Sequence, residues 1–190
     1  MIHHETERLI LRDFEESDLD AVYEYASCPI TTRYLMWGPY NMEETKTLLA
    51  NTIAAQNRRT GPATKFAVVT KDTNELIGRC IIALRGDGSA ELGWLLNPRF
   101  QRRGYTVEFA RVLLKIGFET FGLHRIFAHC DAENYGSWRV MEKLGMRREA
   151  HFLETRPANK TVTDGRKYSD EYEYAILERE YFENIKGETK

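Results

Sequence analysis

A strand that runs into a basic, glycine-containing loop and then into a long helix is the feature that most restricts how this chain folds. Residues 90–96 (AELGWLL) predict a strand that stops at Asn97-Pro98, and residues 99–104 (RFQRRG) form the loop. From Thr106 to Phe121 apolar residues recur every three or four positions, which predicts an amphipathic helix. Free N–H groups where such a helix begins attract an anion, and glycine lets the backbone approach it. The segment predicts a binding site for a diphosphate. Taken by itself, it is also compatible with a surface loop whose arginines are solvated.

The rest of the chain alternates predicted strands and helices. Strands are expected at Thr6–Phe14, Lys65–Thr70, Glu75–Leu84, Arg125–Cys130 and Tyr172–Leu177, with one more strand before Thr163-Asp164-Gly165; helices are expected at Leu19–Ala26, Met42–Arg59 (stopped by Gly61-Pro62) and Ser137–Leu144. Short polar turns join the three strands between Lys65 and Leu96, so these strands are expected to be antiparallel neighbours. Between Pro29 and Pro39 the apolar residues follow neither a strand nor a helix periodicity, so an aromatic loop or short turn is expected there. The predicted fold class is α/β (α+β), with helices packed on a mostly antiparallel sheet.

Composition supports one domain over residues 1–190, because 42% of the residues are hydrophobic. The balance of 27 basic and 29 acidic residues gives no reason to expect nucleic acid or a membrane surface as partner. The longest apolar run, Cys80–Leu84, is far shorter than the roughly 20 residues of a membrane-spanning helix. Residues 1–7 do not resemble a secretory signal, and three scattered cysteines favour neither disulfides nor a metal site. A cytoplasmic location is expected.

Two separate segments resemble the GCN5-related N-acetyltransferase (GNAT) superfamily. Gln101–Thr106 (QRRGYT) resembles the family's Q/R-x-x-G-x-G/A motif, and Asn134–Met146 is similar to its N-x-x-S/A…E-K-x-G-F segment. The ends of the chain, Thr6–Arg12 and Ser169–Leu177, look like those of the subgroup that acetylates the N-termini of ribosomal proteins. The resemblance extends from Thr6 to Tyr181.

This resemblance implies a GNAT fold whose fourth and fifth strands, Glu91–Leu96 and Arg125–Cys130, splay into a V that holds acetyl-CoA. The backbone at the end of the fourth strand would pair with the pantetheine arm, and the loop would bind the diphosphate, with Arg99, Arg102 and Arg103 near the 3′-phosphate. The implied cofactor-binding residues are Trp94, Leu95, Leu96, Gln101, Arg102, Arg103, Gly104, Tyr105, Thr106, Asn134 and Ser137. Thr106 departs from the motif, because Gly or Ala is usual there.

The chemistry that the resemblance implies is direct attack of a primary amine on the thioester, with no covalent enzyme intermediate and no metal. Glu91 stands where relatives carry a general base, although a solvated strand-end glutamate is an equal alternative. The tyrosine that serves many relatives as acid is replaced by Met141, which leaves Ser137 as the expected acid or as a helix N-cap. His129 falls at another acid position of the family, but a plain strand histidine is the favoured interpretation.

The acceptor is less constrained than the donor. An α-amine has a reference pKa of about 7.7–8.0 against about 10.4 for lysine. A weaker general base is therefore sufficient to deprotonate a protein or peptide N-terminus. A small-molecule amine stays open, as does a CoA-binding regulatory module without turnover. Acceptor selectivity is expected in the loops Pro29–Tyr40 and Arg156–Ser169, where Tyr34, Trp37 and Tyr40 either line the acceptor site or join the core. Relatives are commonly homodimers, and the sequence leaves the oligomeric state of this chain open.

Overall fold

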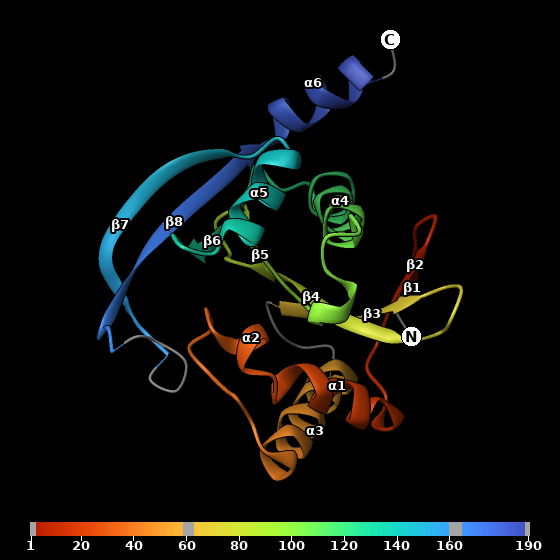
Figure 1. The fold of residues 1–190 in the computed structure, drawn as a ribbon. Coiled ribbons are helices and arrows are strands. Elements are labelled where there is room, and N and C mark those ends of the chain that lie inside the picture. Colours follow the sequence, from red (N-terminus) through yellow and green to blue (C-terminus); the bar gives the residue numbers. More distant parts are fainter. Residues whose placement is uncertain (1–2, 59–62, 160–164, 189–190) are drawn as a thin grey trace.

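The structure is a computed structural model that describes residues 3–58, 63–159 and 165–188. Its strands form one sheet in the order β1-β2-β3-β4-β5-β6-β8-β7, and every neighbouring pair is antiparallel except β5 and β6 (Figure 1). The strands are β1 His3–Glu5, β2 Leu9–Arg12, β3 Ala63–Thr70, β4 Leu76–Leu84, β5 Ser89–Leu96, β6 Arg125–Asp131, β7 Arg147–Pro157 and β8 Tyr168–Leu177. The helices are α1 Leu19–Ala26, α2 Pro29–Thr32, α3 Met42–Arg58, α4 Tyr105–Lys115, α5 Tyr135–Lys143 and α6 Glu178–Glu188. The predicted fold class is confirmed.

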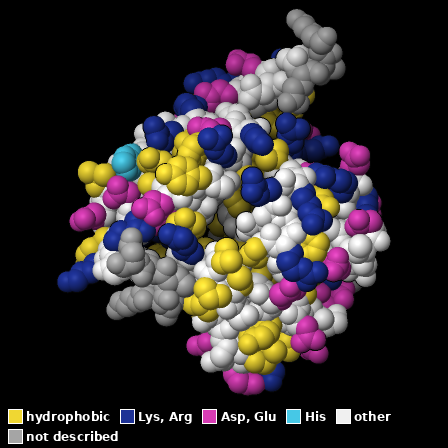
Figure 2. All heavy atoms as spheres, viewed as in Figure 1, with side chains coloured by type: hydrophobic (Ala, Val, Ile, Leu, Met, Phe, Trp, Pro, Cys, Tyr) yellow, Lys and Arg dark blue, Asp and Glu magenta, His cyan; other side chains and the backbone are white. Residues whose placement is uncertain are grey.

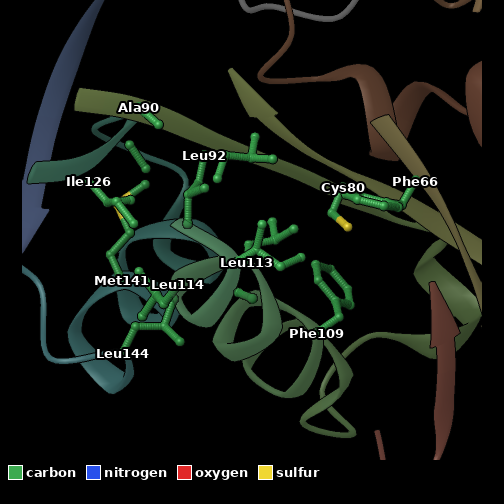
Figure 3. Close-up of a cluster of buried hydrophobic side chains, with 14 of the residues drawn as sticks. Phe66, Cys80, Ala90, Leu92, Phe109, Leu113, Leu114, Ile126, Met141 and Leu144 are labelled. Carbon is green, nitrogen blue, oxygen red and sulfur yellow. The ribbon is translucent and has the colours of Figure 1, made fainter. Parts of the chain in front are cut away.

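Helices cover both faces of the sheet, and each face has its own apolar core. On one face α4 and α5 pack against the middle strands, where Leu113, Met141 and Ile126 are fully buried (Figure 3). On the other face Val22, Tyr25 and other residues of α1 and α3 pack against β3 and β4. Alternate residues of each central strand therefore point to different cores, as the two-residue repeat of a strand requires.

The parallel pair β5 and β6 separates soon after it begins. Only Ser89, Ala90 and Glu91 have partners in β6, the last being Phe127. Both strands continue beyond this point, to Leu96 and Asp131, without a further pair between them. The splayed fourth and fifth strands expected from the resemblance are thus present as β5 and β6, since the short β1 shifts the count by one.

The first predicted strand, Thr6–Phe14, is wrong in its bounds. Only Leu9–Arg12 is a strand, and Thr6 forms a turn because its backbone N–H donates to the Leu9 carbonyl at 2.9 Å while its side chain accepts from the Leu9 N–H at 2.9 Å. A hydroxyl that bonds the nearby backbone competes with a strand ladder. The turn reverses the chain, so that β1 pairs with β2 in a short hairpin.

Other boundaries also differ from the predictions. The strand predicted from Tyr172 begins at Tyr168, and the helix predicted from Ser137 begins at Tyr135. The helix predicted over Thr106–Phe121 begins at Tyr105 and continues beyond α4 as a π-helical turn over Ile116–Thr120. Sequence analysis missed α2, which begins at Pro29, and also α6. The predicted positions Arg59, Gly61-Pro62 and Thr163-Asp164 lie outside the described residues.

Candidate active site

A cavity of about 420 Å³ opens where β5 and β6 part. Figure 2 shows a hollow near the centre of the viewed face, with hydrophobic and basic side chains gathered around it. Residues from β5, β6 and the start of α5 line the cavity, among them Glu91, Trp94, Leu95, His129, Asn134 and Ser137. Five of these six were predicted as site residues, and the structure brings them to one cavity.

The alternation of side chains along β5 and β6 places Glu91 and His129 on the same face of the sheet. Ala128 and Cys130 of β6 belong to the core beneath α4 and α5, so His129 between them points to the opposite face. Glu91 of β5 alternates in the same way with the buried Ala90 and Leu92. Glu91 and His129 therefore share the face that carries the loop after α1.

His129 lies between two carboxylates from neighbouring strands. Its Nδ1 atom is 3.5 Å from Glu91 Oε1, and its Nε2 atom is 2.8 Å from Glu173 Oε2 on β8. Each carboxylate also has a guanidinium partner, because Arg85 pairs with Glu91 and Arg125 Nη2 lies 2.6 Å from Glu173 Oε1. The side chains of Glu91, His129 and Glu173 are 29%, 25% and 20% exposed, so solvent reaches all three only in part.

Asn134 and Ser137 lie together where α5 begins. Asn134 is the N-cap, because its Oδ1 atom accepts a hydrogen bond from the Ser137 N–H at 3.2 Å. The alternative that made Ser137 the N-cap is therefore wrong, and its hydroxyl is not consumed by capping. That hydroxyl hydrogen-bonds the Cys130 side chain, whose burial raises the pKa of the thiol to about 12. Cys130 is a buried thiol, as expected, and Met141 is a buried core residue (Figure 3).

The predicted phosphate loop lies beyond the end of β5. Gln101, Arg102, Arg103 and Gly104 are exposed, and Tyr105 and Thr106 begin α4. Gly104 has φ of +83°, the left-handed conformation that favours glycine, and a Cβ there would meet only Arg8 Nη2 at 3.5 Å. The first N–H groups of a helix have no intrahelical carbonyl, so this end of α4 offers donors to an anion.

Strand β5 leads into this loop through side-chain contacts. The Leu96 carbonyl, at the end of the strand, accepts a hydrogen bond from Gln101 Nε2 at 3.0 Å. Gln101 thus ties the loop to the strand in addition to its predicted cofactor role. Arg99 pairs with Glu24 at 2.7 Å and lies 3.8 Å from Glu75, so its charge is balanced within the protein. The proposed 3′-phosphate role is therefore less suited to Arg99 than to Arg102 or Arg103.

Sequence analysis missed a clamp that fixes the loop from the N-terminal hairpin. Arg8 Nη1 donates to the Arg103 carbonyl at 3.1 Å, and its guanidinium stacks over the Tyr105 ring at 4.6 Å. Glu108 of α4 receives hydrogen bonds from Thr6 Oγ1, the Arg8 N–H and Arg8 Nε. Burial opposes ionisation of Glu108, but these donors outweigh it and hold the pKa of Glu108 below its usual value. The only earlier signal was the Thr6–Arg12 resemblance.

The two loops expected to select the acceptor meet at the other side of the cavity. Arg156 Nη2 donates to the Tyr34 carbonyl at 3.0 Å, and its Nη1 atom is 3.3 Å from Glu171 Oε1. Asn159 Nδ2 lies within hydrogen-bond distance of the Thr32, Trp37 and Gly38 carbonyls. Tyr34 lines the cavity together with Met36, whereas Trp37 and Tyr40 pack against the second core. Of the three aromatic residues considered for the acceptor site, Tyr34 thus lines the cavity, whereas Trp37 and Tyr40 belong to the core.

Within the described residues, no cluster of three or more His, Cys, Asp or Glu side chains is arranged to hold a metal ion. No helix in the described ranges is long and apolar enough to span a membrane. The side chains that line the cavity supply carboxylates, an imidazole, hydroxyls, an amide and guanidinium groups.

A family model described as an acetyltransferase (GNAT) domain matches residues 8–147. The chain belongs to the GNAT family. The matched range includes β5, the loop at Gly104, β6 and α5, which build one side of the cavity and the candidate phosphate site. A GNAT enzyme transfers an acetyl group, so this chain is an N-acetyltransferase.

Known GNAT proteins match nearly the whole chain. The uncharacterized N-acetyltransferase YnaD of Bacillus subtilis (strain 168) is 40% identical over 95% of this chain and 99% of its own. The crystal structure of a GNAT-family acetyltransferase from Bacillus anthracis is 37% identical, with a TM-score of 0.81 over 94% of this chain and 99% of that one. Spermidine N-acetyltransferase from Vibrio cholerae, solved with CoA and spermine, shares the fold at 23% identity, with a TM-score of 0.75 over 93% and 99% of the two chains.

Proposed function

We propose that this GNAT enzyme transfers the acetyl group of acetyl-CoA to the α-amine of a protein or peptide by direct attack. The observation that carries the proposal is the shared cavity, in which the pair Glu91 and His129 faces the acceptor loops while Asn134 and Ser137 flank the divergent end of β5. A proton acceptor and a hydroxyl donor in one cavity are what amine acylation requires.

The residues of the chain fit CoA along the length of that ligand. The β6-facing edge of β5 has no strand partner beyond Glu91, so the backbone there is free to pair with the pantetheine arm. Asn134 keeps its Nδ2 donor for the same arm, since capping uses only Oδ1. The left-handed Gly104, the guanidinium groups of Arg102 and Arg103 and the start of α4 suit a diphosphate.

Charge in the cavity supports an α-amine over a polyamine. Of the three lining carboxylates, Glu91 and Glu171 are already paired with Arg85 and Arg156, and Asp131 accepts a hydrogen bond from the Glu133 N–H. Arg79 adds another guanidinium to the lining. A polyamine would bring several ammonium groups, each needing its own carboxylate, whereas an α-amine brings one. An α-amine also loses its proton near neutral pH, at a reference pKa of about 7.7–8.0.

In the proposed reaction the Glu91 and His129 pair receives the proton of the attacking amine, directly or through a water. The N–C bond forms as the C–S bond breaks, and the electron pair of that bond goes to sulfur. Ser137 donates a hydrogen bond to the departing thiolate, which then takes a proton from solvent. Cys130 stays outside the chemistry because its thiol is buried with a raised pKa of about 12.

An acceptor panel tests the proposal. The purified enzyme and acetyl-CoA are incubated with peptides that carry a free α-amine, with the same peptides blocked at the α-amine but containing lysine, and with spermidine, and products are identified by mass spectrometry. Acetylation of the free α-amine alone is the expected result. Preference for spermidine or for the lysine side chain would overturn the acceptor assignment, and binding of acetyl-CoA without any turnover would favour the regulatory module.

A further inference from the structure

The two ring nitrogens of His129 face different environments. Nε2 lies 2.8 Å from Glu173 Oε2, a hydrogen-bond distance, whereas Nδ1 is 3.5 Å from Oε1 of Glu91, which lines the cavity together with His129. An ionised carboxylate only accepts hydrogen bonds, so the neutral ring places its proton on Nε2 to donate to Glu173. This tautomer leaves the lone pair of Nδ1 on the side of Glu91, a cavity-lining residue.

Glu173 is held in place on its far side. Arg125 Nη2 lies 2.6 Å from Glu173 Oε1 and 2.7 Å from Glu149 Oε2, so the guanidinium ties β6 to both β8 and β7. Residues His129 and Glu173 are also register partners in the antiparallel pair β6 and β8. The sheet itself therefore fixes the orientation of the imidazole.

The charges around His129 are balanced. Glu91 from β5 is paired with Arg85, and Glu173 from β8 is paired with Arg125. The negative charge of each carboxylate next to the ring is therefore balanced by a guanidinium. The other titratable or charged groups around this part of the cavity are Asp131, Glu149, Glu171, Arg79 and Arg156. Carboxylates therefore lie beside both ring nitrogens, and each of these carboxylates has its own guanidinium partner.

We propose that His129 Nδ1 is the atom that takes the proton of the acceptor amine, and that Glu173 is the positioning residue that fixes the ring for this task. The inference rests on the proposed acetyl transfer and refines it, because it assigns the base within the Glu91 and His129 pair. As the N–C bond forms, the amine proton moves to Nδ1, and the imidazolium then donates to Glu91 on one side and Glu173 on the other. The proton later leaves to water.

Kinetics against pH test this assignment with any amine that the wild-type enzyme acetylates. His129→Gln is expected to lower kcat/KM by about 10²-fold or more and to leave only the rise with pH that comes from deprotonation of the amine substrate itself. His151→Gln is the matched control, because His151 also bonds a carboxylate on β8, Asp170 at 3.1 Å, but does not line the cavity. It should leave kcat/KM and its profile unchanged. A wild-type profile in His129→Gln would overturn the proposal.

Chemical rescue and NMR provide readouts that a merely structural role would not move. Added imidazole should restore activity to His129→Ala in proportion to its neutral form, and should not affect Glu91→Gln. Nitrogen-15 spectra of the free enzyme, assigned with His129→Gln, should show His129 protonated on Nε2 in the neutral state, and Glu173→Gln should weaken that preference. A neutral ring protonated on Nδ1 would overturn the arrangement. Absence of turnover with every amine would instead defeat the proposed function, while the NMR result would still decide the tautomer.

Discussion

Asn134 holds the start of α5 by accepting the Ser137 N–H at 3.2 Å, and this one contact orients two candidate substrate-binding groups at once. The amide oxygen of Asn134 is committed to the helix, so its Nδ2 group is the part left for a ligand. Ser137 is the third residue of α5 and lines the cavity. Capping and ligand binding can therefore be separated by substitution.

Two substitutions of Asn134 separate these tasks. Asn134→Asp keeps an oxygen that caps the helix but lacks the Nδ2 donor, so the free energy of unfolding should hold while acetyl-CoA affinity falls by about tenfold. Asn134→Ala should lose both, with a stability cost of about 1 kcal/mol. Chemical denaturation and calorimetric titration with acetyl-CoA measure the two effects. Equal acetyl-CoA affinity in Asn134→Asp and the wild type would show that Nδ2 makes no contact with the ligand.

Glu91 and Ser137 are expected to affect turnover more than binding. Glu91→Gln and Ser137→Ala should each reduce kcat by about 10²-fold, because both groups act on charge that develops during acyl transfer. The acetyl-CoA-induced rise in Tm should persist in both, since the backbone N–H of Ser137 still donates to the Asn134 side chain that caps α5. If kcat is unchanged in both variants, these residues are not the catalytic groups.

The clamp at Glu108 should make stability depend on pH. A carboxyl whose pKa is lowered on folding adds stability that is complete above its usual value of 4.5 and is lost as the pH falls through the lower folded value. Glu108→Gln should therefore cost about 1 kcal/mol at pH 7, and the difference from the wild type should shrink below pH 4.5. Denaturation curves of Glu108→Gln and the wild type from pH 3.5 to pH 8 measure this difference in the free energy of unfolding.

The control for this clamp is Glu43→Gln. Glu43 pairs with Lys46 on the surface and its side chain is 80% exposed, so little change in stability is expected at any pH. A Glu108→Gln difference that stays constant across the pH range would contradict the account of the clamp.

Local patterns were sufficient to predict the parts of the fold that repeat regularly. The amphipathic run after Gly104 and the polar turns between β3, β4 and β5 were predicted in the right positions, and so was the loop that joins β5 to α4. Boundaries were wrong where a side chain redirects the backbone, as Thr6 does before β2. The sequence alone cannot show such a bond, because the same threonine is also compatible with a strand.

The pairing around His129 depends on tertiary structure and was not predictable from spacing. Glu173 is 44 positions away from His129 in sequence and becomes its neighbour only through the register of β6 and β8. The Arg8 clamp joins residues about 100 positions apart in the same way. The resemblance pointed to Asn134 and Ser137 through a motif and to Glu91 through its place on the fourth strand, but it did not point to these long-range partners.

Titration of thermal stability with acetyl-CoA, beside NAD and ATP, tests the central claim that the β5–β6 cleft and the Gly104 loop bind acetyl-CoA. At 100 times its Kd, acetyl-CoA should raise Tm by about 5–10 °C. Gly104→Glu should abolish this rise, because the side chain meets a φ of +83° and brings a negative charge to the diphosphate position. Gly86→Glu, at a φ of +79° in a turn with open space, is the matched control and should keep it. An unchanged Tm of the wild type at millimolar acetyl-CoA, or an undiminished rise in Gly104→Glu, would contradict the account.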